Sequence, residues 1–300
     1  MIESNIIEPS IEVEKWTNVQ VDSQILSTFM ECPRKYDYVF NRHFVPITGV
    51  SKSIQKGQVA HIGIHNYWKA RLEGKDYQES SVIGIDAAKK EIVNFNNLTP
   101  DDSLDVLHVL INFFKYQTTQ SWIPVFTEQH FRILAYEDPS LKLRVFITGR
   151  IDLGLRNPQI KLIPVDVKSE AERWFYSVMR AQFKMYTIAC KTYLLGVQRF
   201  GFQKTVEEKD KFKLEILSFD PDILEEFKTE TLPYYIKRML IAKEDGFYPM
   251  NNASCIHGHF ACQFSDKYNQ GGICGISREL REQKITRYFT IGEPWNPEDF

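Results

Sequence analysis

The sequence lacks any long apolar run. No stretch reaches the length of about 18 consecutive apolar residues that a transmembrane helix needs, so we expect no membrane span. The N-terminal stretch MIESNIIEPSIEVEKW has neither a basic start nor an extended apolar segment, and it does not predict a secretory signal. These absences favour a protein that works in the cytoplasm.

An excess of charge of one sign is lacking too. Lys and Arg number 37 and Asp and Glu number 39, which gives a net charge of −2. No global basic field therefore points to a nucleic-acid partner, although net charge says nothing about local patches. Internal repeats, low-complexity stretches and the pattern G-x-x-x-x-G-K-[ST] are absent, so any unwinding of DNA would come from a partner.

Cysteine is scarce. The 300 residues hold five cysteines, and in a reducing cytoplasm we expect thiols rather than disulfides. The rest of the composition is ordinary for a globular protein, with 43% apolar and 25% charged residues. A chain of this size and composition supports a sizeable apolar core.

The N-terminal part is predicted to be helical. Ser23 is a candidate N-cap, and Pro33 fits the first position of a second helix, so we expect a helical pair broken at Cys32-Pro33. Apolar residues at helical spacing predict further helices at residues 53–72, 79–96 and 102–121.

The middle of the chain changes to strand patterns. Apolar stretches separated by the turn signals EDPS and RNPQ predict three strands in hairpin order, at residues 126–135, 141–155 and 160–168. A helix is then predicted at 177–195, strands at 198–205 and 211–217, and a helix at 221–244. This order predicts a mixed α/β domain with a helical N-terminal part.

No clear linker divides the chain. We expect a loosely ordered arm at residues 1–20, a single domain at 21–280 and a tail at 281–300. Within the domain, segment 246–280 is irregular and holds three of the five cysteines.

The stretch IKLIPVDVKS carries an unusual charge pair. Asp166 and Lys168 are two residues apart, so in a strand both side chains project from the same face. Asp152 lies 14 residues before Asp166 on the adjoining predicted strand, and a hairpin turn would bring the two carboxylates together. Two carboxylates so close repel each other unless a cation lies between them.

This arrangement suits phosphodiester hydrolysis. Mg²⁺ takes oxygen ligands, often one or two carboxylates with waters and phosphates, and it makes a bound water more acidic. Lys168 could orient that water or offset developing negative charge. The alternative interpretation is a surface hairpin with a solvent-facing Asp-Lys pair. Pro164 is typical of a strand edge or start, and D-x-K alone does not separate the two interpretations.

The surrounding segments show a family resemblance. GRIDLGL followed by IPVDVKS resembles the catalytic core of the PD-(D/E)XK nucleases, in the RecB-like branch that includes CRISPR-associated and phage exonucleases. In this likeness Asp152 matches the motif II aspartate, Asp166 the acidic residue of motif III and Lys168 its lysine. Three more segments match in the family's order, and the likeness spans roughly residues 23 to 275: KGQVAHIGIH, AQFKMY and STFMECPRKYDY.

The resemblance implies a fold and a metal site. The fold would be a restriction-endonuclease-like α/β core, in which a mixed central sheet is flanked by helices and followed by a cysteine-containing C-terminal segment. His61, Asp152, Asp166 and the carbonyl of Val167 would hold one or two Mg²⁺ or Mn²⁺ ions. A histidine on such a helix is otherwise a packing residue, and that reading of His61 stays open.

The resemblance also implies roles around the lysine. Lys168 would position the attacking water. Gln182 and Tyr186 are four residues apart on one helical face, and they would orient the lysine or hold the substrate backbone. An ordinary polar edge of a buried helix is the alternative for this pair.

Three further residues are candidates. His65 lies one turn after His61 and is a ligand, a DNA contact or neither. Glu128 is placed just before the first predicted strand, in a supporting role, and Glu170 is expected to line the groove.

Four cysteines match a cluster-binding set. In one part of the RecB-like branch, an N-terminal cysteine and three C-terminal cysteines hold a [4Fe–4S] cluster. Cys32 lies at the matching position of the F-x-x-C-P-x-x-Y segment, and Cys255, Cys262 and Cys274 lie in the matching C-terminal region. Cys190, on the predicted core helix, is expected to be a packing residue.

The cysteine spacing departs from the family. Six and then eleven residues separate the three C-terminal cysteines, where the family has a tight C-x-x-C. His257 and His259 lie in the first of these loops, so a tetrahedral zinc site with Cys and His ligands is an alternative. Unligated thiols are the third interpretation.

These inferences together predict a metal-dependent DNA nuclease. We expect an exonuclease acting in DNA recombination or repair, or in phage DNA processing, in a bacterial or phage-infected cell. DNA would be the substrate, and a helicase or recombination protein a partner. The competing hypothesis is an inactive DNA-binding or scaffold subunit, against which the intact Asp152, Asp166 and Lys168 set argues. A junction or RNA nuclease is a second enzymatic alternative.

Overall fold

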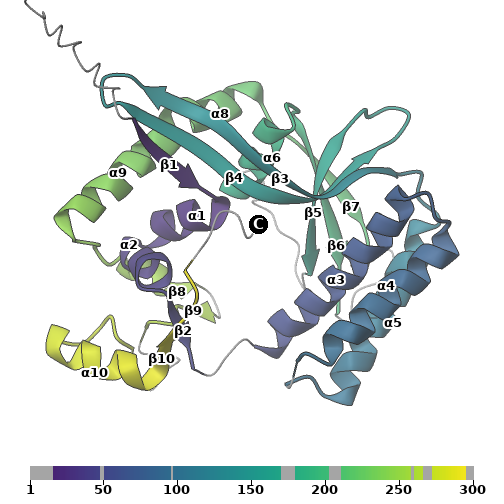
Figure 1. Cartoon of the computed structure of the whole chain (residues 1–300), viewed down its shortest axis with the longest axis horizontal. Helices are drawn as coiled ribbons and strands as arrows, with labels where there is room; N and C mark the ends of the chain where they lie inside the picture. Colours follow the sequence, from purple (N-terminus) through teal and green to yellow (C-terminus); the bar gives the residue numbers. More distant parts are fainter. Residues whose placement is uncertain are drawn as a thin grey trace, which may run out of the picture.

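The computed structural model describes residues 16–47, 51–95, 97–169, 180–202, 211–257, 260–265 and 272–294. Residues 1–15 of the expected arm, Glu170, His259 and the side chain of His257 lie outside this description. The described chain forms one sheet of six strands with two groups of helices beside it (Figure 1). In these ranges no helix is long and apolar enough to cross a membrane.

The large sheet is mixed. Its strands are β1 (Thr17–Val21), β3 (Ile123–Asp138), β4 (Leu143–Arg156), β5 (Ile163–Ser169), β6 (Leu194–Phe200) and β7 (Leu214–Ser218). They lie in the order β1-β4-β5-β6-β7, and β3 also pairs with β4. The β1–β4 and β5–β6 pairs are parallel, and the other pairs are antiparallel. The α/β class and the predicted hairpin order of three strands are therefore confirmed.

The strand β4 has two different neighbours on one edge. β3 pairs with β4 from Leu143 to Arg156 and occupies the other edge. On the shared edge β1 pairs with residues 143–147, and β5 pairs with residues 153–155. Residues 148–152 lie between these two partners, so the sheet forks there. We call this opening the fork.

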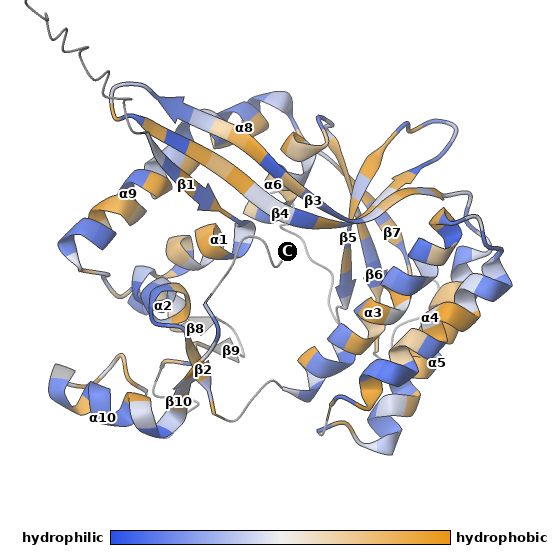
Figure 2. Cartoon of the chain, in the orientation of Figure 1, coloured by the Kyte–Doolittle hydropathy of each residue, from blue (hydrophilic) through white to orange (hydrophobic). Residues whose placement is uncertain are grey.

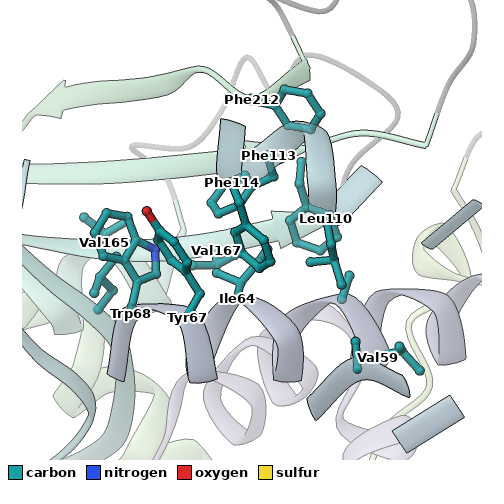
Figure 3. Close-up of a cluster of buried hydrophobic side chains, with 14 of the residues drawn as sticks. Val59, Ile64, Tyr67, Trp68, Leu110, Phe113, Phe114, Val165, Val167 and Phe212 are labelled. Carbon is teal, nitrogen blue, oxygen red and sulfur yellow. The ribbon is translucent and has the colours of Figure 1, made fainter. Parts of the chain in front are cut away.

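Three long helices pack beside β5. They are α3 (Lys52–Leu72), α4 (Tyr77–Ile92) and α5 (Pro100–Gln117), close to the predicted ranges. Figure 3 shows their shared core, in which Tyr67 and Trp68 of α3 lie with Phe113 and Phe114 of α5 and with Val165 and Val167 of β5. The rings of Tyr67 and Phe114 stack with centroids 4.5 Å apart. This core holds β5, and so Asp166 and Lys168, against α3.

A second group of helices packs near β1. It contains α1 (Ser23–Glu31), α6 (Ala181–Ala189), α8 (Pro221–Glu226) and α9 (Leu232–Asp245), with a π-helical turn at Phe227–Thr231. Leu26 of α1, Met185 of α6 and Ile236 of α9 share a core with Ile147 of β4. The N-cap of α1 is Asp22, whose Oδ1 accepts the Ile25 N–H at 2.7 Å, and not Ser23 as predicted. Both residue types cap well, so the sequence did not decide between these neighbours.

The helix predicted at 177–195 is shorter in the structure. Helix α6 ends at Ala189, followed by Cys190 and by Lys191 at φ 50°. Leu194–Phe200 then forms β6 rather than a helix end, and the next strand, β7, begins at Leu214. A buried strand and a buried helix can carry the same continuous apolar run, which is why periodicity misplaced this boundary.

Both ends of the described chain contain ordered elements beyond the expected domain limits. Strand β1 lies partly within the expected arm and is a member of the large sheet. In the expected tail, β10 (Phe289–Ile291) pairs antiparallel with β2 (Phe44–Pro46), and α10 (Arg278–Tyr288) precedes it. Figure 2 shows α10 as mostly hydrophilic.

A further, small core joins the N-terminal and C-terminal parts. After the break at Cys32, α2 (Pro33–Tyr36) and a π-helical turn (Asp37–Asn41) follow α1, which confirms the predicted helical pair. Tyr38 of that turn packs with Phe44, Phe264 and Phe289. The C-terminal elements between are short: a 3-10 turn (Asn252–Ser254), β8 (Ile256–His257) and β9 (Phe260–Ala261).

Candidate active site

Four elements bring the predicted site residues together. Asp152 lies on β4 at the edge of the fork, just before the segment that pairs with β5. The register Leu153 with Val165 places Asp152 opposite the Asp166 end of β5. The backbone N–H of Val167 donates to Asp152 Oδ2 at 2.8 Å. The two predicted carboxylates therefore lie on adjacent antiparallel strands, as the hairpin hypothesis required.

His61 reaches this centre from α3. Its Nε2 lies 3.2 Å from Asp152 Oδ2. Burial alone would lower the pKa of His61, but the hydrogen bond and charge of Asp152 outweigh burial and raise it. Burial would likewise raise the pKa of Asp152, but His61, Lys168 and the Val167 N–H outweigh it and lower that pKa. The pair therefore favours a charged imidazolium next to a charged carboxylate.

Asp166 is the most deeply buried acidic group of the site. Its side chain has no exposed surface, and its Oδ2 lies 3.0 Å from the Nζ of Lys168. This contact is an ion pair, and no other group of the described residues donates a hydrogen bond to either oxygen. Burial is the main reason that the pKa of Asp166 is raised, to about 6. The charge of Asp152 adds to the rise, and the charge of Lys168 opposes it.

Lys168 is connected to α6 by a chain of hydrogen bonds. Its Nζ donates to Gln182 Oε1 at 3.4 Å, and Gln182 Nε2 donates to Tyr186 Oη at 3.0 Å. Tyr186 Oη in turn donates to the carbonyl of Arg150 at 2.7 Å. Burial would lower the pKa of Lys168, but Asp166 and Asp152 outweigh it, so the pKa is raised and the lysine stays charged. Burial raises the pKa of Tyr186 well above its usual value, so the phenol stays neutral.

Glu128 and Arg150 form a further part of the site, of which the sequence motifs indicated Glu128 alone. Glu128 lies inside β3, not just before it, and has the left-handed backbone conformation, φ 48°. Its Oε2 pairs with Arg150 Nε at 2.6 Å, and its Oε1 lies 3.7 Å from His65 Nδ1. Arg150 was not predicted, although its place two residues before Asp152 on a strand puts both side chains on one face.

The donor set fits a hard divalent cation by its chemistry. Two carboxylates on neighbouring strands, one fully buried and the other 15% exposed, are more stable with a cation between them. Carboxylate oxygens are the ligands that Mg²⁺ and Mn²⁺ prefer, and an imidazole beside them favours the softer Mn²⁺ over Mg²⁺. Within the described ranges no group of three or more His, Cys, Asp and Glu side chains is arranged so that it could hold a metal ion. His61 Nε2 contacts Asp152 instead.

The four cysteines of the predicted set lie near one another. Burial raises the pKa of the Cys274 thiol to about 12, and Cys262, Cys32 and Cys255 add to the rise. All five cysteines are free thiols, and Cys190 at the end of α6 is separate from the four. Neither an iron–sulfur nor a zinc site is formed among the described residues.

Backbone contacts hold the cysteine-bearing segments in place. The Cys262 N–H donates to the carbonyl of Cys255 at 2.9 Å, and the Asn251 N–H points to Cys32 Sγ at 3.4 Å. Asn251 Nδ2 also donates to the Glu31 carbonyl at 2.8 Å. The C-terminal segment is therefore tied to the end of α1, where Cys32 lies.

Comparison with known proteins identifies a family. The family model described as the PD-(D/E)XK nuclease superfamily matches residues 23–266. No curated protein matches the sequence. A solved structure titled "Crystal structure of SSO0001" aligns with 62% of this chain and 75% of its own chain, at 12% identity and a TM-score of 0.30. That alignment is too weak to add to the assignment, which rests on the family model and on the mixed sheet flanked by helices.

Proposed function

This chain belongs to the PD-(D/E)XK nuclease superfamily, and on that premise we propose that it is a DNA exonuclease of the RecB-like branch. Membership implies metal-dependent nuclease activity. The observation that carries the proposal is the placement of Asp152, Asp166 and Lys168 on β4 and β5, with Asp166 fully buried and paired to Lys168 at 3.0 Å. A surface hairpin would leave these side chains in solvent.

The metal would be held by residues of three elements. His61 of α3, Asp152 of β4, and Asp166 with the Val167 carbonyl of β5 are the proposed ligands of Mg²⁺ or Mn²⁺. When bound, such an ion acidifies a water and stabilises negative charge on a phosphate oxygen. His61 has to be neutral and released from Asp152 to act as a ligand, so binding should release a proton.

Lys168 is proposed to position the attacking water. Its ammonium is charged, a quarter exposed, and fixed on one side by Asp166. Gln182 accepts from it, and Tyr186 holds Gln182 and the Arg150 carbonyl. These contacts limit the rotamers of the lysine and so would keep a donor in place for the attacking water.

The cysteine set is proposed to hold a cofactor away from the catalytic carboxylates. Cys32, Cys255, Cys262 and Cys274 would ligate a [4Fe–4S] cluster. Burial raises the pKa of the Cys255, Cys262 and Cys274 thiols, and other cysteines of the set add to each rise, so the four lie within electrostatic reach of one another. Zinc held by a mixture of Cys and His is the second candidate. Either would connect the end of α1 to the C-terminal segment.

The biological setting is a proposal from the resemblance. The nuclease would act in DNA recombination or repair, or in phage DNA processing, inside a bacterial or phage-infected cell and with a helicase or recombination partner. A catalytically inactive DNA-binding or scaffold subunit is the second candidate function. The complete Asp152, Asp166 and Lys168 set favours activity, since a purely structural subunit has no need of a buried carboxylate pair.

The test is cleavage of end-labelled linear DNA, single- and double-stranded, beside a covalently closed circle of the same sequence. With Mg²⁺ or Mn²⁺, the wild type should shorten the linear strands from an end and leave the circle intact, and Asp166→Ala should do neither. Cleavage of the circle would refute the exonuclease assignment. Binding without cleavage under both metals would favour the scaffold hypothesis.

A further inference from the structure

A small cavity of about 150 Å³ lies beside Asp152, in the fork of the sheet. It is bounded by β3, β4, α6 and the start of α1, and its lining comprises Asp22, Ser23, Gln24, Phe131, Thr148, Gly149, Arg150, Asp152, Gln182, Met185 and Tyr186. The catalytic roles proposed above use only its edge, at Asp152, Gln182 and Tyr186. The rest of its lining has no assigned role.

Thr148 supplies a buried polar group without a partner. The residue is 7% exposed, and its hydroxyl makes no hydrogen bond within the described residues. Leaving a buried hydroxyl unpaired costs roughly 1–3 kcal/mol, so a valine at this place would serve folding better. Thr148 also lines the cavity, so a group bound there could become the partner of this hydroxyl after a rotation of the side chain.

Arg150 supplies a positive charge at the same place. Thr148, Arg150 and Asp152 alternate along β4, so their side chains lie on one face of the strand. Glu128 engages the Nε of Arg150 at 2.6 Å, and the side chain is 42% exposed. Its two terminal nitrogens make no hydrogen bond within the described residues, and these are the guanidinium groups that bind phosphate oxygens.

The remaining lining is not that of a simple anion site. Asp22 contributes a carboxylate, which would repel a bare phosphate. Gln24 and Ser23 contribute neutral polar groups at the start of α1, where the first backbone N–H groups have no intrahelical acceptor. Phe131 and Tyr186 contribute two rings whose centroids lie 6.0 Å apart at 90°. A ligand here must combine an anionic group, hydrogen-bond donors and acceptors, and a flat apolar part.

We propose that this cavity is a subsite for one unpaired nucleotide of the strand being cleaved, next to the scissile phosphate. Arg150 binds the phosphate of that nucleotide, held in place by Glu128. Thr148 and Gln24 hydrogen-bond the sugar or base, against the rings of Phe131 and Tyr186. The inference rests on the proposed nuclease function and deepens it, because a base in this cavity cannot remain paired. The subsite therefore selects single-stranded ends.

Affinity measured without catalysis tests the subsite. We would titrate a fluorescent single-stranded oligodeoxynucleotide, and the same sequence as a blunt duplex, into protein in EDTA at several salt concentrations. Arg150→Gln should weaken single-strand binding about 10-fold and make the slope of log K against log salt shallower by about 0.7, the value for one phosphate contact. Thr148→Val should weaken binding about 3-fold at an unchanged slope. Arg156→Gln, an exposed arginine at the far end of β4, is the matched control and should change neither.

The outcomes separate this subsite from the proposed function. Equal binding by Arg150→Gln, Thr148→Val and wild type would overturn the subsite, as would equal wild-type affinity for the blunt duplex and the single strand. If the wild type binds single strands as expected yet cleaves nothing with metal, the nuclease proposal fails, and the cavity remains a binding site for single strands without a role in cleavage. A terminal 5′-phosphate, a 3′-phosphate and an unphosphorylated end, compared in the same titration, tell a terminal phosphate from an internal one.

Discussion

At the residue scale, Asp166 shows the conflict between stability and the proposed chemistry. The carboxylate is fully buried, its ordinary pKa is near 3.8, and burial raises this to about 6 in the folded protein. Lys168 offsets only part of the cost of the charge. A buried acid of this kind is tolerated where a site needs a ligand for a cation.

Replacing Asp166 with Asn should stabilise the metal-free protein at neutral pH. The folded pKa lies above the unfolded one, so the folded wild type holds a proton that the unfolded chain releases. The wild type therefore loses stability as pH rises from about 4 to about 6, and Asp166→Asn does not. In EDTA, the free energy of unfolding of the variant minus that of the wild type should increase by on the order of 1–2 kcal/mol between pH 4.5 and pH 7.5, measured by urea unfolding. A variant that is less stable than the wild type at pH 7.5 would contradict this account of the site.

Motif spacing could predict single site residues but not all their partners. His61, Asp152 and Lys168 stand in short patterns, and the structure brings them together. The Glu128–Arg150 pair was missed because it depends on two strands and on the φ of 48° at Glu128, which no local pattern specifies. Arg150 could have been found from its alternation with Asp152.

At the element scale, helices α3 and α4 touch at two glycines. A Cβ on Gly84 would lie 2.7 Å from the Gly63 carbonyl oxygen and 2.7 Å from the ring of Phe114. Real Cβ atoms do not approach backbone so closely, so α4 could not keep its place against α3 and α5. This contact supports the core that holds β5.

Gly84→Ala should therefore destabilise the protein, although Gly to Ala within a helix usually stabilises by about 0.5–1 kcal/mol. We expect a loss of about 1–3 kcal/mol from overpacking, measured by urea or thermal unfolding. Val82→Ala, at a side chain that is 56% exposed on the same helix, is the control and should change little. A more stable Gly84→Ala protein would show that the two helices are not this close.

Most elements could be predicted from local pattern, and the exceptions have a physical cause. The helices α3, α4 and α5 have apolar faces with helical period, and β3 to β5 have turn signals between them. The boundary between α6 and β6 failed because β6 begins with the short apolar run Leu194–Val197, which follows closely on the apolar residues of α6. Periodicity alone does not tell a short buried strand from the end of a buried helix.

At the scale of the whole molecule, N-terminal and C-terminal segments of the described chain meet near the cysteines. Strands β2 and β10 pair although they are far apart in sequence, and Tyr38, Phe264 and Phe289 fill the core between. Such long-range pairing has no local signal, so the tail expected at 281–300 could not be recognised as part of the fold. The same holds for β1, which enters the large sheet beside a strand that lies far later in the sequence.

Cys32→Ser should remove the proposed cofactor and lower thermal stability by several degrees, because the link between α1 and the C-terminal segment would be lost. Protein purified without oxygen should contain iron and sulfide and show a brown colour, and the variant should be colourless. Cys190→Ser is the matched control and should keep both colour and metal. Stoichiometric zinc in the purified protein would show that these residues hold zinc rather than an iron–sulfur cluster. Five freely titrating thiols in metal-free native protein would refute both hypotheses.

The central claim is that Lys168 acts beside metal-binding carboxylates to hydrolyse DNA. The most direct test is single-turnover cleavage by Lys168→Ala beside Lys161→Ala, an exposed lysine of the same hairpin, with Mn²⁺ binding measured on each. We predict that Lys168→Ala retains Mn²⁺ binding and loses about 10²- to 10³-fold in rate, while Lys161→Ala cleaves like the wild type. Cleavage at the wild-type rate by Lys168→Ala would contradict the account.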